Sequence, residues 1–192
     1  MPVYEKKSFL SHLVDRTELI SSNTRTFLRC NNGDLNLRPA ADKWSIAEIF
    51  EHLYITHRIS LDQILQRISK APDVKASHFQ TGWLGDFIYE RTMPRADGSL
   101  FRLRTPGMFQ PKSQAYDGRE VLERFLQQQD TIHDVLQHAF CKDLKKIKVP
   151  LPLTRLISLR LGDNLRIIIA HNERHILQAQ RILEARHVVQ AI

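Results

Sequence analysis

Cysteine, glycine and long apolar runs are all scarce in this chain of 192 residues. With only 7 glycines and 8 prolines, the composition excludes collagen-like and low-complexity structure. No stretch approaches the roughly 18–20 apolar residues of a membrane span. The first seven residues hold no apolar segment of the kind found in secretory signals. The sequence therefore predicts a cytoplasmic protein that does not associate with membranes.

The two cysteines, Cys30 and Cys141, are too few for a disulfide framework. Two free thiols in a reducing compartment are the favoured interpretation, and one disulfide is the alternative. Neither cysteine lies in a recognisable nucleophile motif. The formal net charge of +7 permits contact with an anionic partner. However, the basic residues are scattered, and no zinc finger or aromatic-rich RNA motif accompanies them, so we expect no specific nucleic-acid partner.

Hydrophobic residues recur at intervals of three and four, and they predict four long helices. The expected ranges are 7–29, 45–69, 118–140 and 164–186. Ser45 and Glu48 form a capping-box pattern at the start of the second range, and Asp117 with Glu120 resembles one before the third. The fold class is thus all-α, with helical content well above the roughly one-third that is typical. We expect a four-helix bundle forming a single domain over residues 1–192.

Two connections are too long to be simple turns. Residues 71–116 form a crossover between the second and third long helices, which allows a non-sequential helix order. Within it, residues 83–88 predict a short helix and residues 100–104 a short strand. The apolar side chains of the short helix should pack on the bundle and help to wall a site: Trp83, Leu84, Phe87 and Ile88. The second connection, 141–162, contains two prolines and a mixed apolar stretch.

His171 and His175 lie four residues apart, which places them about 40° apart on one helix face, so both imidazoles can converge on one ion. The zinc-protease motif is absent, because Asn172 stands where that motif has glutamate. His52 is a third candidate, at the margin of the apolar face of the second helix. It is either a ligand facing the pair across the bundle or a core-edge histidine bonded to a carbonyl. His57, about 140° further round the helix, is expected to be a core or surface residue.

Two carboxylates near His52 and two arginines of the crossover have two interpretations each. Glu48 and Glu51 are conceivable hydrogen-bond partners of His52, but Glu48 is expected to serve the cap and Glu51 to face solvent. Arg102 and Arg104 of the crossover can attract an anionic cofactor, although solvated surface charge is the commoner role of such residues. The other histidines have no partner at ligand spacing: His12, His78, His133, His138 and His187.

Three segments in order, residues 37–53, 105–111 and 171–182, resemble the DinB-like superfamily of the YfiT/bacillithiol-transferase kind. The resemblance implies a helical bundle in which His52, His171 and His175 hold a divalent metal ion, commonly nickel or zinc. It also implies a homodimer, a small-molecule substrate and, in some relatives, a low-molecular-weight thiol such as bacillithiol. No residue of this sequence is identified as catalytic, and nothing in the chain identifies the thiol.

Two functional hypotheses follow. In the first, the protein is a metal-dependent enzyme, a thiol S-transferase or a hydrolase, because a metal held by three imidazoles keeps a position open for water or substrate. In the second, it is a non-catalytic metal-binding or stress-response helical module. Turnover of an electrophile with a thiol, lost on chelation, would favour the first.

Overall fold

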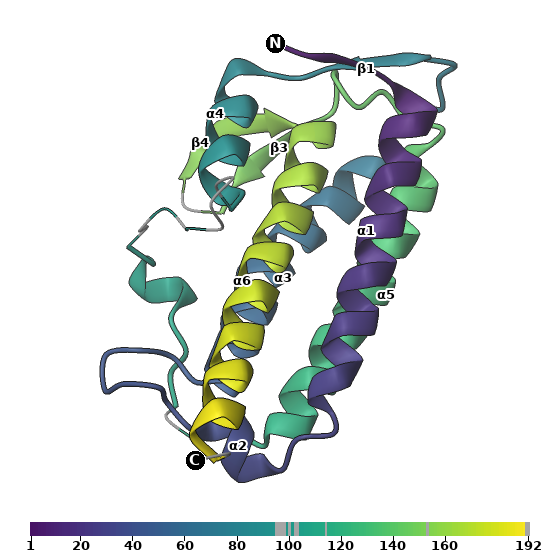
Figure 1. Ribbon diagram of the computed structural model, residues 1–192. Coiled ribbons are helices and arrows are strands. Elements are labelled where there is room, and N and C mark those ends of the chain that lie inside the picture. The colour runs from purple at the N-terminus through teal and green to yellow at the C-terminus, as the bar shows by residue number, and fades with distance from the viewer. Residues whose placement is uncertain (95–98, 100, 102–103, 114, 153, 191–192) are drawn as a thin grey trace.

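The computed structural model describes residues 1–94, 99, 101, 104–113, 115–152 and 154–190, with the backbone alone at 155 and 187–190. Four long helices run side by side (Figure 1): α1 (Lys6–Phe27), α3 (Ile46–Ile68), α5 (Gly118–Ala139) and α6 (Leu161–Gln190). The prediction of a mostly helical fold is confirmed. The predicted helix ranges differ from the observed bounds by only a few residues.

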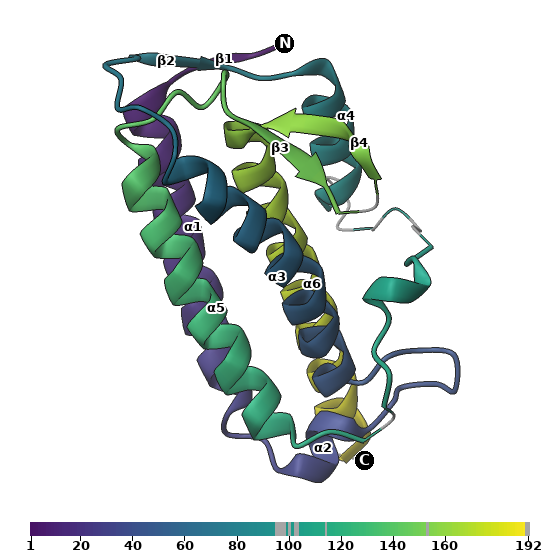
Figure 2. The ribbon, with the colours of Figure 1, turned by 180° about the vertical axis from the view of Figure 1, so that it is seen from behind.

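The four helices are not neighbours in chain order. α1 packs against α5 and α6, and α3 packs against the same two helices, so α1 and α3 occupy opposite corners. Figure 2 shows α3 and α5 side by side from behind. The apolar faces of the helices are buried against one another. The ring centroid of Phe50 on α3 lies 5.5 Å from that of Phe27 on α1 and 5.0 Å from that of Phe125 on α5.

Local sequence sets the helix starts. Ser45 accepts a hydrogen bond from the backbone N–H of Glu48, whose carboxylate accepts one from the N–H of Ser45, so the predicted capping box is confirmed. Asp117 caps α5 through the N–H of Glu120. α6 begins earlier than expected, at Leu161. Asp163 therefore lies inside its first turn, where its carboxylate accepts from the N–H of Gly82 at 2.8 Å.

Smaller elements gather at one end of the long helices (Figure 1): α4 (Trp83–Thr92) and two antiparallel two-stranded sheets, β1 (Val3–Glu5) with β2 (His78–Gln80), and β3 (Lys148–Leu151) with β4 (Thr154–Arg160). The sequence predicted none of these strands. β1, β2 and β3 have only three or four residues, which is too short to show an alternating pattern, and the seven residues of β4 do not alternate, because Leu156 and Ile157 are adjacent. A five-residue helix, α2 (Asn32–Asn36), lies at the other end. In the expected strand at 100–104, residues 100, 102 and 103 lie outside the described residues.

The packing predicted for the short helix is only partly right. α4 lies against α6, and Ile88 faces the pocket described below. Trp83 and Phe87, however, are 71% and 47% exposed and do not line that pocket. The reason is the close approach of Gly85 to Asp163, which puts the opposite face of α4 against α6.

Cys30 and Cys141 are free thiols. Within the described residues, no helix has the length and apolar character needed to cross a bilayer.

Candidate metal centre

Three histidines from two helices meet in the interior. His52 lies in the second turn of α3, and His171 and His175 lie one turn apart in the middle of α6. One ring nitrogen from each lies within 4.8 Å of those of the other two. The ring centroids are 4.6 to 5.2 Å apart. This triad has the residue types and spacing that can hold a metal ion.

The Nδ1 atom of each triad histidine has a partner that fixes the ring. His52 donates from Nδ1 to the backbone carbonyl of Phe109 at 2.8 Å, because a carbonyl can only accept. Nδ1 of His175 lies 3.1 Å from Oε1 of Gln178, which accepts in the same way. The corresponding tautomer of His171 donates from Nδ1 to Nε2 of His57 at 3.0 Å. Partners of this kind orient metal-binding imidazoles and leave their Nε2 lone pairs free.

The free nitrogens then face one another. Nε2 of His171 and Nε2 of His175 are 3.1 Å apart. With both Nδ1 atoms protonated, two lone pairs meet across this distance, an arrangement that a shared cation stabilises. The donor set is three borderline-soft imidazoles, which suits zinc or nickel better than magnesium or calcium. The residues present therefore fit a divalent transition metal.

Burial keeps these rings uncharged. It lowers the pKa of His52 below the ordinary 6.5, although the bond to Phe109 acts in the opposite direction. Burial lowers the pKa values of His171 and His175 further, helped by neighbouring positive charge. At neutral pH the three imidazoles are unprotonated, which is the form that binds a metal.

His57 is the residue that sequence reasoning missed. It is buried on α3, and burial lowers its pKa to about 3. Its interior position was one of the two expected, but its bond to His171 depends on how α3 and α6 pack. Trp44 also packs beside the triad, since its ring centroid lies 4.9 Å from that of His52 and 6.5 Å from that of His175. A search for ligand spacing cannot find such partners, because they act through the ligands.

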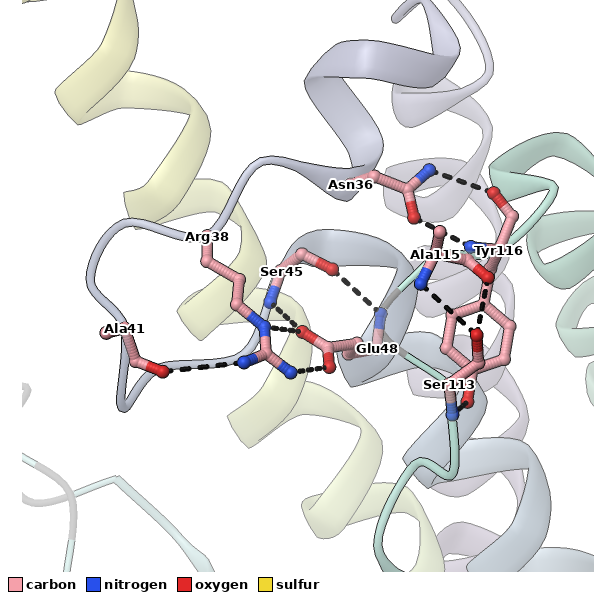
Figure 3. Close-up of polar contacts among 8 residues, drawn as sticks. All are labelled: Asn36, Arg38, Ala41, Ser45, Glu48, Ser113, Ala115 and Tyr116. Atoms are coloured by element: carbon pink, nitrogen blue, oxygen red, sulfur yellow. Dashed lines mark hydrogen bonds and ion pairs between the residues drawn. The ribbon is translucent and has the colours of Figure 1, made fainter.

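The neighbouring carboxylates do not orient His52. Glu48 serves the cap and also accepts hydrogen bonds from Nε and Nη2 of Arg38 (Figure 3). The expectation that Glu51 faces solvent is wrong: its side chain is 13% exposed and pairs with Arg124 of α5 at 2.5 Å. This ion pair forms because α3 and α5 pack closely, which the local sequence does not show.

A cavity of about 390 Å³ opens onto the triad. The crossover contributes Thr105, Pro106 and Phe109, and the β3–β4 sheet contributes Leu151 and Leu159. Arg104 also lines the cavity, at an exposed position. Arg102 lies outside the described residues. A largely apolar pocket with a few convergent polar groups is the usual form of a small-molecule site.

Comparison with known proteins identifies the family. A model of the DinB superfamily matches residues 17–179, a range that contains all three triad histidines and both connections. Searches among curated proteins and among solved structures found no match. The match covers most of the chain, and so this protein belongs to the DinB superfamily.

Proposed function

We propose that this protein is a metal-dependent enzyme in which His52, His171 and His175 hold one divalent ion, nickel or zinc. The observation that carries the proposal is the set of three inward-facing imidazole nitrogens, each held by a partner at its Nδ1 atom. Histidines without a role in metal binding would not need three rings fixed around one point.

The proposed reaction is thiol S-transfer, and hydrolysis is the alternative reaction at the same metal. A divalent ion bound by three imidazoles lowers the pKa of a bound thiol or water, so that it reacts near neutral pH. The chain's own residues orient the imidazoles and exclude water: Phe109 fixes His52, and the apolar walls of the cavity surround the open side. The substrate is a small molecule, and a low-molecular-weight thiol is the proposed co-substrate.

Metal content tests the ligand set. We expect about one ion per chain by inductively coupled plasma mass spectrometry after incubation with Ni²⁺ or Zn²⁺ and dialysis. His52→Ala, His171→Ala and His175→Ala should each retain much less metal, because a three-ligand site loses most of its affinity with one ligand. The control is His138→Ala, an exposed histidine of α5 bonded to a backbone carbonyl. Full occupancy in His52→Ala, with helical circular dichroism unchanged, would contradict the proposal.

Turnover separates the enzyme from a non-catalytic metal-binding or stress-response module. The assay follows consumption of an electrophile such as a chlorodinitrobenzene with a small thiol. Activity should disappear with a chelator and return with metal. If the metal binds and no thiol or hydrolytic turnover occurs across such a screen, the protein is the non-catalytic module.

We further propose that the four long helices form one DinB/YfiT-type four-helix bundle domain over residues 1–192. The support is that each long helix packs against two others around a common core. A single cooperative unfolding transition is expected from one domain of this size. We also propose that the protein forms a homodimer in the cytoplasm, without a membrane or specific nucleic-acid partner.

A further inference from the structure

Arg174 is a buried cation beside the triad. It lies on α6 between the two histidines of that helix, is 8% exposed and lines the cavity. One guanidinium nitrogen, Nη2, donates to the backbone carbonyl of Phe101. A second guanidinium nitrogen, Nη1, is buried and has no hydrogen-bond partner among the described residues.

Two other buried or half-buried arginines on the helices around Arg174, Arg166 and Arg16, have carboxylate partners. Arg166 is similarly buried and pairs with Asp86 at 2.5 Å and Asp163 at 2.8 Å. Arg16 pairs with Glu173, the neighbour of Arg174, at 2.5 Å. Within the part of the chain that the structure describes, no carboxylate pairs with Arg174, and burial lowers the pKa of its guanidinium. A buried charge without a counter-ion is unfavourable. The buried guanidinium of Arg174 therefore indicates that an anionic ligand binds beside it.

The surroundings of Arg174 indicate what carries that anion. On α6, Asn164, Ile167 and Ile168 precede the triad residues along the same cavity wall. Apolar side chains from four elements other than α6 also line the cavity: Ile88, Phe109, Leu151 and Leu159. Arg104, the other arginine that lines the cavity, is exposed to solvent, so Arg174 is the buried cation of the cavity. One buried cation in a mainly apolar pocket fits a ligand with an apolar body and a single acidic group. A monoanionic carboxylate suits it best, because the planar guanidinium matches a carboxylate and a second negative charge would add desolvation cost.

We propose that the substrate that reacts at the histidine triad is a small amphipathic carboxylate, whose acidic group binds Nη1 of Arg174 while its apolar body fills the cavity. This inference rests on the proposed function, since it takes the triad as the reacting centre. It assigns to Arg174 the positioning of substrate beside that centre, through Nη1, which has no partner within the described part of the chain.

Binding of a matched pair of probes tests the inference without any turnover. Hexanoate and 1-hexanol have the same alkyl chain and differ in charge. Isothermal titration calorimetry is performed on the full chain after chelation, so that no metal contributes to carboxylate binding. Wild-type protein should bind hexanoate roughly tenfold to a hundredfold more tightly than hexanol, the range expected for a hydrogen bond to a charged group.

Two substitutions and one control decide the outcome. Arg174→Met keeps the apolar stem and should abolish the preference for hexanoate, while Arg174→Lys keeps the charge and should retain part of it. Arg119→Gln removes one positive charge from an exposed position of α5 and should leave the preference unchanged. Circular dichroism establishes that each variant is folded, since Arg174 also holds Phe101.

Equal binding of the two probes by wild-type protein would overturn the inference, as would a preference that survives in folded Arg174→Met. Arg174→Met should still bind Ni²⁺ through the triad. A loss of the hexanoate preference therefore reports on Arg174, whereas a failure of His52→Ala to lose metal reports on the proposed function. The two can fail independently.

Discussion

The buried carboxylate of Glu48 should contribute a large share of the stability of the helix that carries His52. Its side chain is 1% exposed and has two roles: it accepts from the N–H of Ser45 at 2.8 Å and it pairs with Arg38 (Figure 3). Glu48→Gln keeps an oxygen for the cap and removes the ion pair. Glu48→Ala removes both. The two variants therefore separate the contributions.

The magnitude follows from the burial of each partner. Removing one member of a fully buried ion pair costs about 3–5 kcal/mol, but Arg38 is 30% exposed and water can solvate it in the variant. We therefore expect Glu48→Gln to lower the free energy of unfolding by about 1–2 kcal/mol. Glu48→Ala should cost about 1 kcal/mol more, which is typical of a lost helix cap.

The stabilisation by the Glu48 carboxylate should also depend on pH. Burial by itself raises the pKa of Glu48, but the hydrogen bonds from Arg38 and Ser45 outweigh it, so the pKa lies below the ordinary 4.5. The unfolded chain then binds a proton at a higher pH than the folded chain does. The stabilisation is complete above about pH 4.5 and is lost as the pH falls through the folded pKa. The difference between wild type and Glu48→Gln should therefore shrink in acid.

Urea unfolding followed by circular dichroism at pH 7 and in acid measures these differences. Glu123→Gln is the matched control, because Glu123 forms an exposed ion pair with Arg119 and its loss should change stability by less than about 0.5 kcal/mol. Losses below about 0.5 kcal/mol in both Glu48 variants would refute the reasoning. So would a difference that stays constant down to pH 3.

Three further predictions concern packing, protonation and assembly. Gly85→Ala should cost about 1–3 kcal/mol, because a Cβ there would lie 2.3 Å from Cγ of Asp163. Gly107→Ala is the control: apart from its chain neighbours, no atom of the described residues lies within 4 Å of a Cβ there, so the change should stay within about 0.5 kcal/mol in the same urea assay. The pKa of His57 is about 3 when folded and 6.5 when exposed, so below pH 6.5 only the unfolded chain takes up this proton. Chelated protein should therefore lose about 2 kcal/mol between pH 7 and pH 5 through this residue, and a pH slope unchanged in folded His57→Phe would contradict that. Light scattering should give twice the 22.4 kDa chain mass, and the monomer mass would exclude the homodimer.

The amino-acid sequence determined the helices because their signals are local. Hydrophobic residues at helical spacing specified the four long helices, and the Ser45–Glu48 pattern located the start of α3 within one residue. The i, i+4 spacing likewise placed His171 and His175 on one face, since helix geometry alone decides it. The proximity of His52 to that pair came from family resemblance and from the need to bury two apolar faces together.

Only the tertiary structure decided which groups meet across helices. The bond between His57 and His171, the carbonyl of Phe109 at His52 and the pairing of Glu51 with Arg124 each join residues more than fifty positions apart. No local pattern encodes such contacts, because they depend on the relative position and rotation of packed elements. The same holds for the exposure of Trp83, which depends on the face that Gly85 turns toward α6. Helix formation is a property of neighbouring residues, whereas a binding site arises from the close packing of distant ones.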